Sequence, residues 1–66
     1  MSRWRQVSHL ADLLSYAAGR TVQRELGSNC RWETQFTDGT AVLVDFDSHQ
    51  RGLFAWDGGG APEGNR

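Results

Sequence analysis

The chain from residue 30 to residue 57 alternates apolar and polar positions in three runs, 30–36, 40–47 and 52–57, which polar turn residues separate. Alternation with a period of two, in runs rich in β-branched and aromatic residues, is typical of β-strands. Short connections between such runs favour antiparallel neighbours. The pattern therefore predicts a three-stranded antiparallel meander.

The first turn fixes how the first two strands pair. A two-residue turn at Asp38 and Gly39 mixes apolar and acidic side chains on each face. A three-residue turn over 37–39, with Gly39 in the left-handed conformation as a G1 bulge, instead pairs Trp32 with Val44. We expect this second arrangement, because it collects the aromatic side chains on one side.

The second turn allows two registers. One places Val44 opposite Trp56, and the rival buries Leu53 and Ala55 while leaving Phe54 and Trp56 in water. Burying a large apolar side chain is worth roughly 1.5–3 kcal/mol, so the first register is preferred. The expected inner face is Trp32, Phe36, Val42, Val44, Phe46, Phe54 and Trp56. The expected outer face is Glu33, Gln35, Leu43, Asp45, Asp47, Leu53 and Asp57.

Residues 1–27 follow a helical pattern, in which Val7, Leu10, Leu14 and Ala18 recur on one stripe. The phase slips near Gly19, so we expect a helix that is kinked or broken there and closed by Gly27. The alternative makes residues 21–26 a fourth strand. The fold class that follows is α+β, with the N-terminal helix packed on the three-stranded antiparallel meander as one domain over 1–57. Residues 58–66 are rich in Gly and are expected to form a flexible tail.

Composition narrows the function classes. The 66 residues suffice for one small domain, and the single cysteine leaves no internal disulfide. The longest apolar run is far too short to span a membrane, and the N-terminus carries no apolar signal segment, so we expect a cytoplasmic protein. A net charge of −1 disfavours a strongly basic nucleic-acid binder.

Catalytic and metal sites find little support in the sequence. Ser8, His9 and Asp12 surround an expected helix start, where Ser and Asp are ordinary capping residues. Cys30 has no neighbouring base that would activate it. The glycines of the tail lack the context of a phosphate-binding loop, and the acidic pair around Phe46 lacks a nucleotide motif. We therefore expect no enzyme, no cofactor and no metal.

The acids of the outer face give the sharper hypothesis. Carboxylates on three adjacent strands about 4.8 Å apart approach the charge spacing of a phosphate backbone. Exposed leucines among them would supply the apolar centre of a protein interface. The simpler reading is a solvated sheet face, in which acids aid solubility and discourage edge pairing. The predicted partner-binding residues are Glu33, Leu43, Asp45, Asp47, Leu53 and Asp57.

In build rather than in motif, a small cysteine-poor chain with a helix over a sheet that presents Glu33, Asp45, Asp47 and Asp57 resembles the small anti-CRISPR proteins of phages and mobile elements. The resemblance covers residues 7–57 and implies a monomeric inhibitor in the cytoplasm of a bacterial host. Its partner would be a protein with a basic groove, such as a Cas effector subunit, blocked by local imitation of DNA. Strong DNA mimics are more acidic than −1, so any imitation here would be confined to one face.

The alternative is a small nucleic-acid-binding or regulatory module that uses the N-terminal part of the chain. There Trp4 would stack on a base while neighbouring arginines contact phosphates. The cationic residues concerned are Arg3, Arg5, Arg20 and Arg24. Trp4 as a core residue with solvated arginines is the plainer interpretation.

Overall fold

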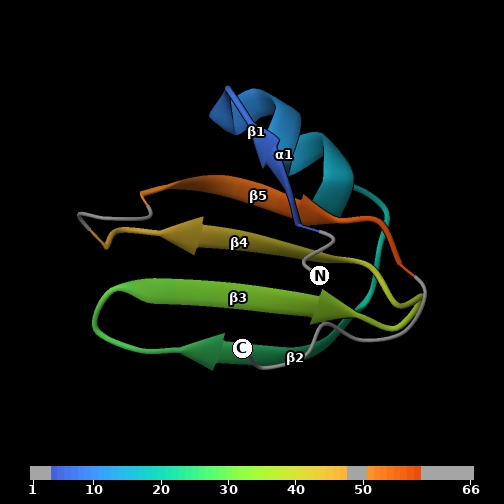
Figure 1. Ribbon diagram of the computed structural model, residues 1–66. Coiled ribbons are helices and arrows are strands. Elements are labelled where there is room, and N and C mark those ends of the chain that lie inside the picture. Colours follow the sequence, from blue (N-terminus) through green and yellow to red (C-terminus); the bar gives the residue numbers. More distant parts are fainter. Residues whose placement is uncertain (1–3, 48–50, 59–66) are drawn as a thin grey trace.

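The computed structural model describes residues 4–47 and 51–58. Its elements are β1 Trp4–Val7, α1 Leu10–Ala17, β2 Val22–Gly27, β3 Arg31–Phe36, β4 Ala41–Asp45 and β5 Gly52–Trp56. The strands form one antiparallel sheet in the order β1-β5-β4-β3-β2, and α1 packs near its β1 side (Figure 1). An α+β fold is thus confirmed, but with five strands where the sequence predicts three.

The helix expected over residues 1–27 is wrong in its extent. Among the described residues only Leu10–Ala17 is helical, with His9 as the N-cap, and no kink is present. Gly19 has a φ of 76° and lies just beyond the helix end, a backbone conformation that glycine adopts at little cost. The slip in phase near Gly19 therefore marks the end of the helix. Beyond it, residues 22–27 form β2 against β3, as the alternative interpretation had it.

The first predicted turn is confirmed. Trp32 pairs with Val44 and Thr34 with Val42. Gly39 has a φ of 89°, and the Phe36 N–H donates to the Thr40 carbonyl over 2.8 Å. The local turn chemistry of residues 37–39 is thus sufficient to set this register.

The register predicted for the second hairpin is wrong. Val44 lies opposite Leu53, and Leu43 lies opposite Phe54, which is the rival arrangement. Because side chains alternate along a strand, Leu53 and Ala55 face the helix, whereas Phe54 and Trp56 point to the other side. The residues 48–50 of the connecting turn lie outside the described part of the chain.

The physical reason is the unexpected first strand. β1 pairs with β5 and brings Trp4 opposite Trp56, with ring centroids 5.2 Å apart in an edge-to-face arrangement. Phe54 shares that face with Leu43, which is buried. The side away from the helix is therefore apolar over part of its area, and Trp56 is buried there without facing α1.

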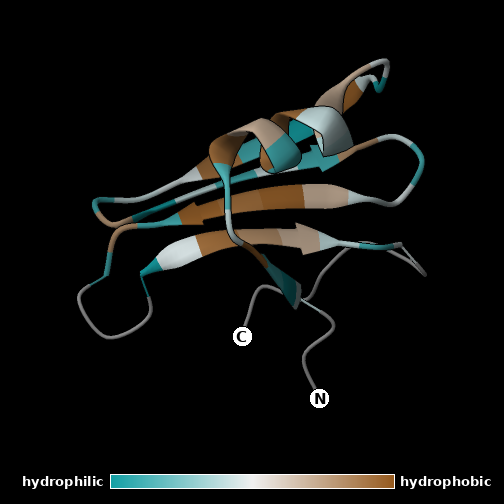
Figure 2. Cartoon of the chain, turned by 90° about the horizontal axis from the view of Figure 1, so that it is seen from above, coloured by the Kyte–Doolittle hydropathy of each residue, from teal (hydrophilic) through white to brown (hydrophobic). Residues whose placement is uncertain are grey.

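The core beneath the helix is small. Val7, Leu13 and Ala55 are buried in it, and Tyr16, Val42, Val44 and Leu53 pack against them. Leu13 is the one buried residue of α1. Figure 2 shows apolar positions along the helix and along the strands, in agreement with this packing.

Two further expectations concern the chain ends and membranes. Apart from Gly58, the predicted flexible tail lies outside the described residues. Among the residues that are described, no helix has the length and apolar character required to cross a bilayer.

Gly39 and Gly27 form a matched pair for testing the turn. Alanine at Gly39 should destabilise the fold by about 1–2 kcal/mol, because a Cβ disfavours the left-handed conformation. Alanine at Gly27, which has an ordinary φ and no heavy atom within 4 Å of an added Cβ, should be nearly neutral. Urea denaturation of both variants measures the difference, and equal losses would contradict the assignment of the bulge.

Leu13 and Leu26 test the core in the same way. Leu13→Ala should cost about 2–5 kcal/mol, because it leaves a cavity between helix and sheet. Leu26→Ala, at a side chain 39% exposed, should change the free energy of unfolding by about 0.5 kcal/mol or less. A stable Leu13→Ala protein would show that the helix is not anchored there.

Candidate functional site

Three of the six predicted binding residues lie on the sheet face away from the helix and are buried. Glu33 is 6% exposed, Leu43 3% and Asp45 7%. Glu33 and Leu43 are direct neighbours across β3 and β4, and Asp45 follows two residues later on the same face. The structure brings these residues together, but the expectation that they form an exposed acidic face is wrong.

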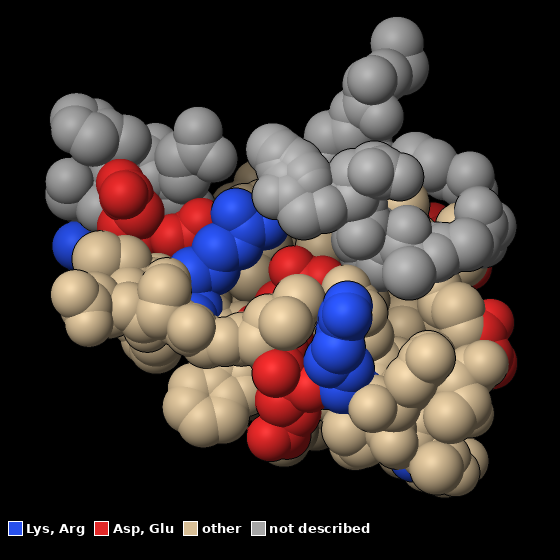
Figure 3. All heavy atoms as spheres, turned by 90° about the horizontal axis from the view of Figure 1, so that it is seen from below, with Lys and Arg blue, Asp and Glu red and all other residues tan. Residues whose placement is uncertain are grey.

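Hydrogen bonds within the chain occupy two of these carboxylates. The Gln35 amide donates to Glu33 Oε2 over 2.7 Å, and the Asp47 N–H donates to Asp45 Oδ1 over 2.9 Å. Buried polar groups require such partners, since an unpaired one is costly. Seen from the β2 side, red and blue atoms lie beside one another in the described part of the surface (Figure 3).

The other three predicted residues lie apart from one another. Leu53 packs in the core under the helix. Asp57 is exposed and accepts a hydrogen bond from the Arg5 guanidinium over 2.9 Å. Asp47 is half-buried next to the end of β4. A role of these residues in binding a partner stays a prediction, but their expected common face does not form.

Arg5 joins three elements at the β1 edge. Its guanidinium donates to the Tyr16 hydroxyl and lies 5.3 Å from the centre of the Tyr16 ring. With the Asp57 carboxylate on its other side, it links β1, α1 and the end of β5. This is a structural use of an arginine that the alternative hypothesis assigns to phosphates.

A second cluster closes the turn between β3 and β4. Asp38 accepts hydrogen bonds from the Thr40 hydroxyl over 2.5 Å, from the Thr40 N–H over 2.9 Å, and from the Arg20 guanidinium over 2.8 Å. Arg20 also donates to the Thr40 hydroxyl over 2.6 Å. The Thr40 hydroxyl and then the Thr40 N–H hold the pKa of Asp38 below its usual value, and Arg20 adds to the effect. The cluster ties the segment after α1 to the β3–β4 turn.

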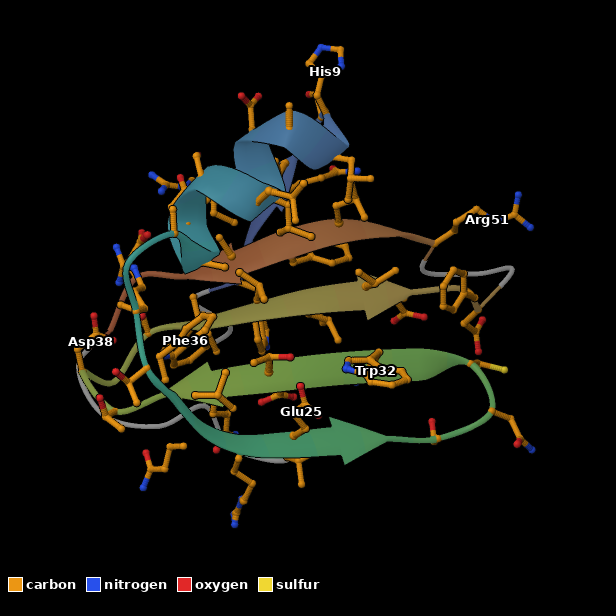
Figure 4. All side chains as sticks on the ribbon, turned by 180° about the vertical axis from the view of Figure 1, so that it is seen from behind. His9, Glu25, Trp32, Phe36, Asp38 and Arg51 are labelled. Carbon is orange, nitrogen blue, oxygen red and sulfur yellow. The ribbon has the colours of Figure 1, made fainter. Side chains whose placement is uncertain are left out.

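The exposed apolar residues gather elsewhere, on the helix side of the sheet. α1 packs on β1, β5 and β4, so β3 and β2 lie uncovered on that side. Trp32 and Glu25 project there, over β3 and β2 and away from the helix (Figure 4). Trp32 is 52% exposed and Phe46 is 62% exposed. Both were expected in the core, and both are on the expected face, but the helix does not reach them.

Phe46 joins this surface through its backbone. Its N–H donates to the Cys30 carbonyl over 2.6 Å, so the β3–β4 ladder continues one residue beyond β4. Alternation then places Phe46 on the same side as Val44 and Trp32. We call Trp32, Phe46 and the half-buried Val42 and Val44 between β3 and the helix the apolar platform.

The helix adds two leucines to the platform. At about 100° per residue, Tyr16 lies about 60° to one side of Leu13, and its contact with Arg5 identifies that side as the β1 side. Leu10 and Leu14 lie about 60° and 100° to the other side, toward β4 and β3. They are 57% and 61% exposed. We call this pair the leucine flank.

Sequence reasoning missed this surface because it assumed that one helix covers one sheet. The signal that could have revealed it is size: an eight-residue helix is about 12 Å long and about 10 Å wide, whereas strands lie about 4.8 Å apart. Such a helix covers roughly half of a five-stranded sheet.

The residues of the nucleic-acid alternative do not gather into one described surface. Trp4 packs on Trp56, Arg5 contacts Tyr16 and Asp57, and Arg20 contacts Asp38. Arg24 lies exposed on β2, and Arg3 is outside the described residues. That alternative also stays untested.

In the described ranges, no group of three or more His, Cys, Asp or Glu side chains is placed to hold a metal ion. Comparison with known protein families, curated proteins and solved structures finds no match for this chain.

The Asp38 cluster makes a prediction about pH. A carboxylate whose pKa is lower when folded contributes stability above its unfolded pKa of about 3.9, and this contribution is lost as the pH falls through the folded value. Thr40→Val should raise the pKa of Asp38 more than Arg20→Gln does, because the hydroxyl has the larger effect. Carbon-detected NMR titration of the Asp38 carboxyl measures both; the reverse order would contradict the cluster as described.

Proposed function

We propose that this chain is a non-enzymatic protein-interaction module that binds through the apolar platform and the leucine flank. The observation that supports it is the distribution of apolar side chains. Trp32, Phe46, Leu10 and Leu14 are each more than half exposed on one side, while no large side chain among the described residues is fully buried. Contiguous exposed apolar surface on a small protein marks an interaction site.

The composition of the surface suits a protein partner. Aromatic residues are enriched at the centres of protein interfaces, where Trp in particular contributes much of the binding energy. Here Trp32 on β3 and Glu25 on the neighbouring strand β2 project to the same side of the sheet (Figure 4). An apolar centre beside a charged group is the usual anatomy of such a site.

The inhibitor hypothesis is a narrower form of this proposal. Occupation of a basic, nucleic-acid-binding groove, as in anti-CRISPR proteins, would require exposed carboxylates, and among the predicted ones Asp57 is exposed while Glu33 and Asp45 are buried. A partner with an apolar contact surface fits the described side chains better.

The test compares leucines on the two sides of the sheet. The tagged chain is used to capture proteins from the cells that encode it, the captured protein is purified, and its dissociation constant is measured. Leu14→Glu and Trp32→Ala should each weaken binding at least tenfold, equivalent to about 1.4 kcal/mol. Leu26→Glu, at an exposed leucine on the opposite face, is the matched control.

Two outcomes would contradict the proposal. Equal weakening by Leu26→Glu would show that the effect is not confined to the platform. Loss of binding in Asp47→Arg and Asp57→Arg, with Leu14→Glu and Trp32→Ala unchanged, would return the site to the acidic residues.

A further inference from the structure

We infer that the platform is occupied by a second copy of the same chain, in a twofold dimer in which α1 of each copy lies over β3 and β2 of the other. This inference rests on the proposed function and names its partner. The sequence predicts a monomer; the surfaces of α1 and of the sheet favour a dimer for three reasons.

The first reason is the character of the helix. α1 reads Leu-Ala-Asp-Leu-Leu-Ser-Tyr-Ala and carries one charged residue, Asp12. Its side away from the sheet, about 160° from Leu13 in either direction, holds Ala11 and Ser15, which are both exposed. A surface helix normally presents charged residues to water, and a helix that is apolar around most of its circumference is normally buried. The back of α1 is therefore suited to a contact.

The second reason is shape. The helix forms a ridge over β1, β5 and β4, and the uncovered β3 and β2 form a step beside it that is about one helix diameter wide. Two copies placed face to face, with the twofold axis parallel to α1 along the seam, put each ridge onto the step of the other. A twofold interface must be self-complementary, and a ridge next to a step of equal width meets this condition.

The third reason is that a second copy covers all of these surfaces at once. In this arrangement the leucine flanks of the two copies meet at the seam. Trp32 of each copy contacts the small residues Ala11 and Ser15 on the back of the other helix, while Phe46, which follows β4, lies at the end of the seam. A single partner helix laid on the platform would contact the leucine flank but would leave the back of α1 in water.

Charge does not oppose this association. The net charge of the chain is −1, so two copies repel each other little. The platform and flank residues themselves are uncharged, and Glu25, which projects on the same side from the edge strand β2, lies at the outer rim of the area that the other helix covers. A chain of 66 residues also gains from association, since domains of this size bury a smaller fraction of their surface on folding than larger domains do.

Sedimentation equilibrium of the full chain tests the inference. The expected mass at micromolar concentration is twice the 7.4 kDa of one chain. Ala11→Arg places a long cation on the back of the helix at an exposed position, and it should raise the dimer dissociation constant at least tenfold, as should Trp32→Ala. Leu26→Glu is the control and should leave the dissociation constant unchanged, and circular dichroism confirms that each variant is folded.

A measurement on the unchanged chain makes the test independent of the variants. In a mixture of isotope-labelled and unlabelled protein, filtered NMR should detect contacts between the Ala11 methyl of one copy and the Trp32 ring of the other. A monomeric mass throughout the micromolar range, or a dimer that Ala11→Arg leaves intact, would overturn the inference. A monomer that still captures a different protein through Trp32 would overturn the dimer alone and leave the proposed function standing.

Discussion

The pairing of β1 with β5 is the interaction on which the rest of this structure depends. It places Trp4 against Trp56 on the side of the sheet away from the helix. Once Trp56 has an aromatic neighbour on that side, alternation along β5 turns Leu53 and Ala55 toward α1. The register of β5 on β4 then follows, and with it the side of the sheet on which Leu53, Phe54 and Trp56 lie.

This division of side chains explains why carboxylates lie in the interior while aromatic residues lie in water. Glu33 and Asp45 share their face with Leu43 and Phe54, so their alternation places them in a partly apolar environment. Hydrogen bonds from Gln35 and from the Asp47 backbone compensate for part of the lost hydration. Trp32 and Phe46 point to the helix side, but α1 packs on β1, β5 and β4 and does not cover them.

The short helix has a second effect on the architecture. Its end at Ala17, just before Gly19, leaves residues 22–27 free to extend the sheet as β2, which widens the area that the helix would need to cover. The arginine contacts, Arg5 with Tyr16 and Asp57 and Arg20 with Asp38, hold the remaining connections in place. A sheet widened on one side and a helix limited to eight residues together produce the apolar platform.

Local chemistry in the sequence determined the parts of this protein that depend on neighbouring residues alone. The alternation of β3 and β4, the G1 bulge at Gly39 and the pairing of Trp32 with Val44 all follow from a turn of three residues, and the structure confirms them. The α+β class follows in the same way from one helical stripe and several alternating runs.

The tertiary structure alone decided the register of β5, the strand character of residues 4–7 and the choice of strand for residues 22–27. Each depends on a partner strand distant in sequence or on apolar neighbours across the sheet, and a burial preference cannot specify a face when both faces are partly apolar. The location of the candidate site also depended on the tertiary structure. Trp32 on β3 is exposed because α1 packs on β1, β5 and β4 and does not extend over β3.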